Sequence, residues 1–142
     1  MIKVKRPLMK LVKLIELPYL KENNGDLVVV EGEIIPFSIK RVFNVRQQKG
    51  DIRGRHAHRH CSQLLICTNG AVEVKCDDSR TTEIYVLDKP NFGLFIPPGI
   101  WGHQKYIEDN TTLTVLCDRP YEEADYIRNY DDFKLFSKQN IG

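Results

Sequence analysis

The stretch GDIRGRHAHRHCSQLLICTNG, residues 50 to 70, decides the fold. Within it, His56 and His58 are separated by one residue, Gln63 follows, and Gly70 closes the segment. Side chains two positions apart in a strand share one face. The two histidines are therefore predicted to project together into whatever the sheet encloses. A second strand returning through Gln63 would bring a third polar group to the same place.

The rest of the chain reads as short strands separated by turns, which is typical of an antiparallel barrel. Asn69-Gly70 predicts a two-residue hairpin, and residues 131–138 predict a short C-terminal helix. Helical crossovers between strands are lacking, which argues against a parallel α/β sheet. The predicted strands are residues 27–30, 39–45, 63–68, 71–76, 82–87, 93–96 and 111–117.

Composition favours one globular domain over residues 1–142. The 21 basic and 19 acidic residues nearly balance, so a nucleic-acid partner is not expected. No apolar run is long enough to span a membrane, and the first residues lack the pattern of a signal peptide. A cytoplasmic protein is therefore expected.

The four cysteines show no zinc-type C-x2-C spacing. In the expected reducing compartment they are predicted to be buried, reduced thiols. They are Cys61, Cys67, Cys76 and Cys117.

The spacing in residues 50–70 resembles the first motif of the cupin family, G-x5-H-x-H-x4-E-x6-G, with Gln63 in place of the usual glutamate. The resemblance implies a cupin jelly roll, that is, a double-stranded β-helix. Metal-binding cupins also carry P-x-G-x2-H. Here Gly102 occupies the histidine position, and His103 comes one residue late, on the opposite face of a regular strand unless a β-bulge intervenes. Since Gln63 is neutral, no metal cofactor is predicted.

Without a metal, the histidine pair is suited to proton transfer near neutral pH. Arg53 and Arg41 suggest an anionic ligand, because guanidinium groups suit phosphate oxygens. A bend at Gly54 could turn Arg53 toward the histidines. Trp101 could stack on a base or sugar, although filling the barrel is its ordinary role.

Five segments resemble the sugar 3,4-ketoisomerases, a cupin branch. They are IPFSIKRV (35–42), RGRHAH (53–58), QLLICTNG (63–70), GLFIPPGIW (93–101) and ADYIRNYDDF (124–133). The resemblance covers roughly residues 22–136. It implies a metal-independent isomerase that moves a ketone from C4 to C3 of a thymidine-diphosphate 4-keto-6-deoxy sugar, in deoxysugar and lipopolysaccharide O-antigen biosynthesis.

The resemblance also implies a homodimer in which the first 20 or so residues exchange a strand between subunits. Apolar residues without an obvious place in a barrel favour the same role for this segment. They are Leu8, Leu11, Val12, Leu14, Ile15 and Leu17.

His56 and His58 are the expected acid–base residues, acting through an enediolate that Gln63 could stabilise. Whether one histidine shuttles the proton or two groups share the work is left open by the residues. The residues expected to bind the substrate are Arg53, Arg41, Gln63, Asn24, Asn44, Trp101, Gly102 and His103.

Several positions depart from the family pattern at the sugar end of the site. Phe43 and Asn44 replace tyrosines, Gly102 replaces a histidine or arginine, and Asn24 occupies a position associated with sugar contacts. Alternative functions are therefore a non-catalytic nucleotide-sugar-binding cupin, a metal-dependent cupin, and a 3,5-epimerase. An epimerase would be expected to use a His–Asp dyad with a tyrosine acid, which the histidine pair alone does not resemble.

Overall fold

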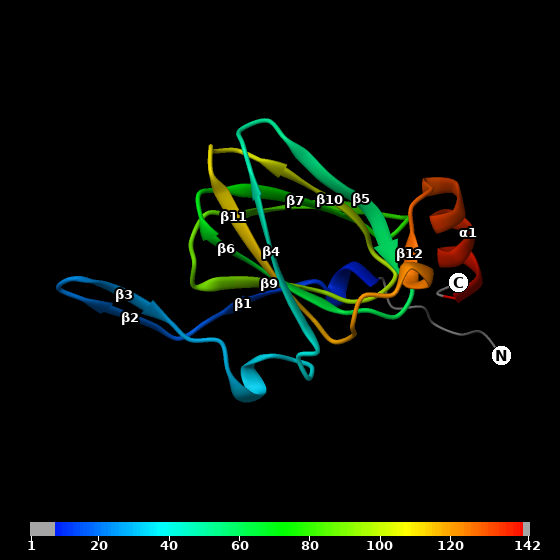
Figure 1. Cartoon of the computed structure of the whole chain (residues 1–142). Coiled ribbons are helices and arrows are strands. Elements are labelled where there is room, and N and C mark those ends of the chain that lie inside the picture. Colours follow the sequence, from blue (N-terminus) through cyan, green and yellow to red (C-terminus); the bar gives the residue numbers. More distant parts are fainter. Residues whose placement is uncertain (1–7, 141–142) are drawn as a thin grey trace.

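The computed structural model describes residues 8–140, which form two five-stranded antiparallel sheets that face each other (Figure 1). The first sheet has the order β1 (Lys13–Glu16), β9 (Phe92–Ile96), β6 (Gln63–Asn69), β11 (Thr111–Cys117) and β4 (Arg41–Gln47). The second has the order β12 (Tyr126–Ile127), β5 (Ile52–His58), β10 (Trp101–Tyr106), β7 (Val72–Asp77) and β8 (Thr82–Leu87). The predicted all-β antiparallel fold is confirmed.

The remaining elements lie outside the two sheets. One helix, α1 (Tyr130–Asn140), follows β12 and confirms the predicted C-terminal helix. Single 3-10 turns occur at η1 (Leu8–Leu11), η2 (Gly32–Ile34) and η3 (Glu123–Asp125). Within residues 8–140, no helix is long and apolar enough to cross a membrane.

Strand β6 is apolar without interruption because both of its faces are covered. Leu65 and Cys67 belong to the core between the sheets. Leu64 and Ile66 point the other way and pack in a second cluster with Leu17 and other residues of the segment after β1. A strand buried on both faces needs no polar alternation, which explains the run LLIC.

The N-terminal segment closes its own barrel. Strand β1 pairs with β9 of the same chain, and both Val12 and Leu17 are buried. The expectation that these apolar residues lack a place in the barrel is therefore wrong for Val12 and Leu17. The side chain of Leu8 and the structure of residues 1–7 lie outside the described part.

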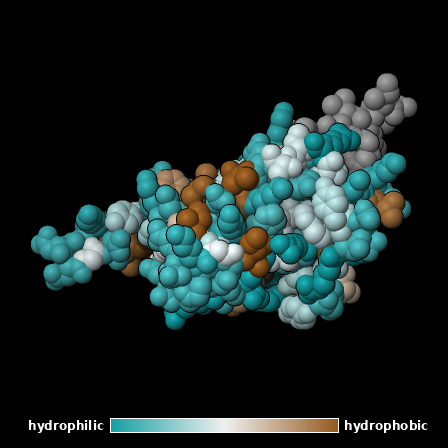
Figure 2. All heavy atoms as spheres, turned by 90° about the horizontal axis from the view of Figure 1, so that it is seen from above, coloured by the Kyte–Doolittle hydropathy of each residue, from teal (hydrophilic) through white to brown (hydrophobic). Residues whose placement is uncertain are grey.

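The hairpin of β2 (Tyr19–Glu22) and β3 (Gly25–Val28) extends from the barrel as an arm (Figure 1). Its two strands pair only with each other, and Leu20 and Leu27 are about half exposed, at 55% and 50%. Figure 2 shows the arm projecting from a surface on which apolar side chains are scattered between polar ones.

The turn at Asn69-Gly70 exists, but it does not form a hairpin. Strand β6 belongs to the first sheet and β7 to the second, so the turn carries the chain from one sheet to the other. Gly70 has φ of +84°, and a Cβ there would lie 2.3 Å from Thr111 Oγ1. The sequence signal for a turn was correct, whereas the pairing partner was wrong.

All four cysteines are free and buried, as predicted.

Substituting Gly70 tests how tightly this crossover is packed. Gly70→Ala combines a disfavoured positive φ with a clash against Thr111, whereas Gly50→Ala has a similar φ of +91° and nothing within 4 Å. We expect Gly50→Ala to lower the free energy of unfolding by about 1 kcal/mol and Gly70→Ala by roughly 1–3 kcal/mol more. Urea unfolding would measure both, and equal losses would contradict the clash.

Candidate functional site

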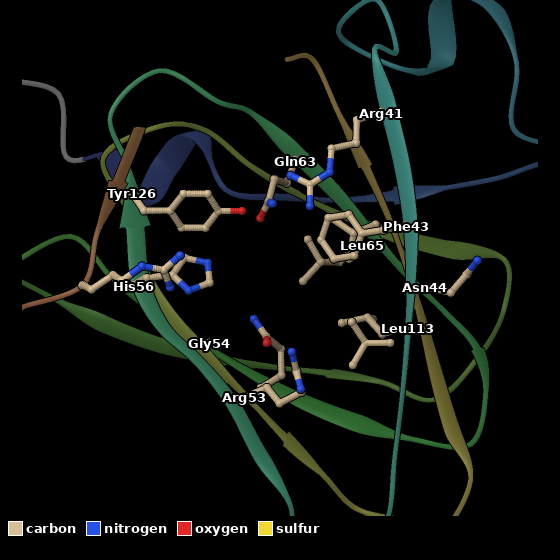
Figure 3. Close-up of a pocket in the computed structure, with 14 residues that line it drawn as sticks. Arg41, Phe43, Asn44, Arg53, Gly54, His56, Gln63, Leu65, Leu113 and Tyr126 are labelled. Atoms are coloured by element: carbon tan, nitrogen blue, oxygen red, sulfur yellow. The ribbon is translucent and has the colours of Figure 1, made fainter. Parts of the chain in front are cut away.

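A cavity of about 340 Å³ opens between the two sheets (Figure 3). A smaller pocket beside it shares His56, Gln63 and Gln104, and extends to His58 and Gly102. The larger cavity is lined by Arg41, Phe43, Asn44, Val45, Arg53, Gly54, His56, Gln63, Leu65, Gln104, Leu113, Val115, Tyr126 and Arg128.

The histidine pair lies on β5 and faces the interior, as predicted. His56 lines both cavities and His58 the smaller one. Their rings meet edge to face with centroids 5.1 Å apart. The spacing of one residue therefore does place two imidazoles at one site.

A β-bulge in β5 sets the direction of Arg53. On β10, Gly102 is opposite His56 and His103 is opposite Gly54, so Arg55 has no partner in this pairing. Gly54 and Arg55 both have positive φ, of 97° and 62°. The extra residue puts Arg53 on the same side as His56, which confirms the expected bend.

His58 is held by a buried carboxylate. Asp125 Oδ2 lies 2.8 Å from His58 Nδ1, and Asp125 Oδ1 accepts a 2.6 Å hydrogen bond from the backbone N–H of His60. Burial raises the pKa of Asp125, but the hydrogen bonds from His58 and His60 outweigh it and hold the pKa below its usual value. An ionised carboxylate therefore fixes the ring of His58, with Nδ1–H donating.

The position of Asp125 follows from strand pairing. It ends η3, and the next two residues form β12, where Tyr126 lies opposite His58 on β5. His58 Nε2 is left buried and without a hydrogen-bond partner in the described residues. Burial lowers the pKa of His58 and the Asp125 carboxylate opposes this effect, with a net decrease.

His56 has the more strongly shifted titration. Burial of its ring and the neighbouring His58 and Arg128 lower its pKa to about 4. The imidazole is therefore neutral at physiological pH and able to accept a proton.

Tyr126 and Arg128 were not predicted as site residues. The ring of Tyr126 packs against His58 at 4.5 Å and His56 at 5.1 Å, measured between centroids. The guanidinium of Arg128 lies 4.4 Å from the centroid of the Tyr126 ring and pairs with Glu123 at 2.8 Å. The segment ADYIRNYDDF carried these residues and Asp125, but only as a family signature, because nothing local in it indicates a cavity.

The opposite wall of the cavity combines apolar side chains with amides. Phe43 faces inward from β4, with the Arg41 guanidinium 4.5 Å from its ring centroid. Gln63 donates from Nε2 to Cys117 Sγ over 3.6 Å, and Gln104 was also missed by the sequence reading. Arg41, Arg53 and Arg128 line the cavity and give it positive charge, which suits an anionic ligand.

Two predicted substrate residues lie beside the cavity without reaching into it. Asn44 borders it, but its Oδ1 accepts a 2.6 Å hydrogen bond from Thr114 Oγ1, and its amide points away (Figure 3). Trp101 packs instead against Tyr130 and Phe133 of α1.

Two others lie further away. Asn24 is in the exposed turn of the arm. His103 has neighbours Gly102 and Gln104 that both line the smaller pocket, so its own side chain faces the other side of β10. The bulge that could have turned His103 inward is in β5, whereas the pairing of β10 with β7 is regular through this point.

Gly102 itself lines the smaller pocket, and a Cβ there would come within 2.7 Å of the Lys75 carbonyl oxygen. A larger residue at this position therefore requires the backbone of β7 to move.

Among the described residues, few further ligands are available for a metal ion at the histidine pair. His103 faces away, and Gln63 is neutral and bonded to Cys117. Ligand atoms of His58, Cys61 and Asp125 do lie within 4.8 Å of one another. Both oxygens of Asp125 already accept hydrogen bonds, however, so this cluster fits a metal ion poorly.

Comparison with known proteins agrees with this geometry. The family model "FdtA: WxcM-like, C-terminal" matches residues 10–138. The chain is 38% identical over 126 residues to a TDP-4-oxo-6-deoxy-alpha-D-glucose-3,4-oxoisomerase from Aneurinibacillus thermoaerophilus, covering 87% of this chain and 91% of the relative.

Two solved structures have the same fold. One is a histidine-to-asparagine mutant of the 3,4-ketoisomerase QdtA from Thermoanaerobacterium thermosaccharolyticum in complex with TDP-4-keto-6-deoxyglucose, with 35% identity, a TM-score of 0.87, and 91% and 95% of the two chains covered. The other is a 3,4-ketoisomerase from Helicobacter canadensis, with 34% identity, a TM-score of 0.85, and 89% and 97% covered. With its histidine pair, arginine-ringed cavity and matched length, the chain belongs to the FdtA family of cupin-fold proteins.

Proposed function

We propose that this chain is a sugar 3,4-ketoisomerase that converts a TDP-linked 4-keto-6-deoxy sugar into its 3-keto isomer. The observation that carries the proposal is His56, a neutral imidazole that faces a cavity ringed by arginines. The enzyme would work in the cytoplasm, without a metal, and supply deoxysugars for a surface polysaccharide such as O-antigen. Its relatives named as 3,4-oxoisomerase and 3,4-ketoisomerase support this reading.

The chemistry needs only acid and base. The C4 carbonyl acidifies the hydrogen on C3, a neutral imidazole removes it, and an enediolate forms. Return of a proton at C4 completes the transfer of the ketone. His56 is the base that the cavity favours, because His58 lies deeper and its Nδ1 is bonded to Asp125. Gln63 and Gln104 could donate from their amides to the enediolate oxygens.

The arginines would hold the diphosphate. Arg53, Arg41 and Arg128 come from three different strands or loops and all line the cavity. Guanidinium groups bind phosphate oxygens through paired hydrogen bonds. Arg53, which the bulge turns inward, is the residue we assign first to this role.

A 3,5-epimerase is the second candidate, because the structure supplies the dyad and tyrosine that the histidine pair alone did not. His58 and Asp125 form the dyad, and Tyr126 stacks beside it. In deuterated water a 3,5-epimerase would exchange the hydrogens on both C3 and C5, whereas a 3,4-ketoisomerase would exchange the hydrogen on C3 alone and form a 3-keto product. A protein that binds TDP and exchanges neither position would be a binding module.

The arm supports a homodimer. Leu20 and Leu27 are exposed, and within residues 8–140 the two strands of the arm pair with no other strand. We propose that the arm, rather than β1, packs on a second copy. Asn24 at its tip could then contact the sugar in the partner's cavity, since it cannot reach its own.

Histidine and arginine variants should separate chemistry from binding. His56→Asn and His58→Asn are each expected to lower kcat at least about 100-fold with little change in TDP affinity, because they act on the transition state. Arg53→Ala should raise KM about ten-fold or more through a lost charge-assisted contact. Steady-state kinetics on TDP-4-keto-6-deoxyglucose and TDP binding by calorimetry would measure both. Histidine variants with wild-type turnover would refute the acid–base assignment.

The pH profile should reflect the shifted base. A base must be unprotonated to act, so activity is lost as the pH falls through its pKa. Since the pKa of His56 is lowered to about 4, kcat/KM should stay nearly constant from neutral pH down to about 5, instead of falling near the ordinary histidine value of about 6.5. Circular dichroism at each pH controls for unfolding. An acid limb near 6.5 would exclude His56 with this pKa as the base.

Subunit complementation would test the arm. A variant with the hairpin of residues 19–28 replaced by a short glycine linker should be monomeric by light scattering and poorly active. Co-expression with His56→Asn should restore measurable activity, because each mixed dimer would have one intact site, which combines His56 of the deletion variant with the arm of its partner. A fully active hairpin deletion, or no recovery in the mixed dimers, would count against a shared site.

A further inference from the structure

We propose that Tyr126 is a further catalytic residue that delivers the proton to C4, on the same face of the sugar from which His56 removes the proton at C3. This inference rests on the proposed ketoisomerase function. It assigns the proton donor that the sequence left open, and it fixes the configuration of the product at C4.

The hydroxyl of Tyr126 is available for such a role. Figure 3 shows the phenol projecting into the cavity next to His56. Within residues 8–140 this hydroxyl has no hydrogen-bond partner. Four other tyrosines donate to carboxylates: Tyr19 to Asp26, Tyr85 to Glu83, Tyr121 to Glu123, and Tyr130 to Asp77.

A cation lies beside Tyr126. The guanidinium of Arg128 is 4.4 Å from the centroid of its ring. Phe43 stands on β4 across the cavity, so that wall offers no phenol. The phenol hydroxyl of the cavity therefore comes from Tyr126, because the opposite wall has a phenylalanine, Phe43, and no tyrosine.

His56 and Tyr126 together account for every proton that moves to or from carbon in the reaction. The C3–H bond breaks and its proton passes to His56, while its electron pair forms the C3–C4 double bond of the enediolate. The Tyr126 O–H bond then breaks and its proton forms the new C4–H bond. The hydroxyl proton of O3 passes to O4, leaving a ketone at C3. The imidazolium of His56 returns its proton to the phenolate, whose ring centroid is 5.1 Å away.

Both proton carriers stand on one side of the cavity. His56 is on β5 and Tyr126 on β12, and these strands are neighbours in the second sheet. The first sheet contributes Arg41, Phe43, Gln63 and apolar side chains to the lining. None of those lining groups exchanges protons readily near neutral pH.

One-sided proton transfer has a stereochemical consequence. In a 4-keto-6-deoxyglucose chair, the hydrogen on C3 is axial, and axial bonds on adjacent carbons point to opposite faces. A hydrogen returned to C4 on the face that C3 lost is therefore equatorial, and the new C4 hydroxyl is axial. The product would have the galacto configuration at C4. Delivery from the opposite face would give the gluco configuration.

The test uses Tyr126→Phe, with Tyr130→Phe as a matched control that loses a hydroxyl bonded to Asp77 outside the cavity. Each protein is incubated with TDP-4-keto-6-deoxyglucose in deuterated water and followed by NMR. Tyr126→Phe should still exchange the hydrogen on C3 at a rate within a few-fold of wild type, whereas ketone transfer should fall about 100-fold or more. Tyr130→Phe should match wild type in both rates.

The outcomes separate the two proposals. Wild type that exchanges no hydrogen on C3 and forms no 3-keto product would refute the ketoisomerase function and this inference with it. If wild type is active, unchanged ketone transfer in Tyr126→Phe, or loss of C3 exchange as complete as the loss of transfer, would overturn the role of Tyr126 alone. In product formed in ordinary water, where C4 receives hydrogen rather than deuterium, the vicinal coupling between the hydrogens on C4 and C5 reports the configuration. A large coupling would show an equatorial hydroxyl and overturn one-sided delivery.

Discussion

The hydrogen bond between His58 and Asp125 is the contact on which the site depends. It joins β5, near the middle of the chain, to the segment just before β12, and it requires β12 to pair with β5 in a register that sets Tyr126 opposite His58. A shift of one residue in that register would turn Tyr126 out of the cavity and move the carboxylate away from the imidazole. The C-terminal segment is thus part of the candidate site rather than a lid over it.

The same hydrogen bond makes the environments of the two histidines different. His58 is bonded to an ionised carboxylate, which fixes its ring and tautomer. His56 has no such partner, and burial together with nearby positive charge keeps it neutral. Two imidazoles on one strand therefore differ in hydrogen bonding and in pKa. The residues that cause the difference lie about 70 positions further along the chain. Sequence periodicity does not reveal contacts over such a separation.

The sequence predicted well what depends on local pattern. Strands β4 and β8 were found from alternation, β11 from its β-branched and apolar residues, and the inward histidine pair from a spacing of two. The predictions from sequence were wrong where the structure depends on pairing between strands that are distant in the chain. Asn69-Gly70 was a correct turn with the wrong partner, because β6 finds its neighbours β9 and β11 only after the chain has crossed to the other sheet. His103 and Trp101 were assigned to the site by proximity to a motif, yet alternation along β10 directs them away from the cavity.

The β-bulge at Arg55 shows why the departures from the family pattern need not abolish catalysis. Gly54 accepts a positive φ readily, but the φ of 62° at Arg55 is costly, and such backbone is usually retained where the site requires it. Here the bulge directs Arg53, the proposed anion-binding residue, and His56, the proposed base, into the same cavity from a single strand. Phe43 belongs to the facing sheet, and Asn44 next to it is bonded to Thr114 on the neighbouring strand. Substitutions on that wall can therefore change which sugar fits, while the groups proposed to move protons stay together on β5 and β12.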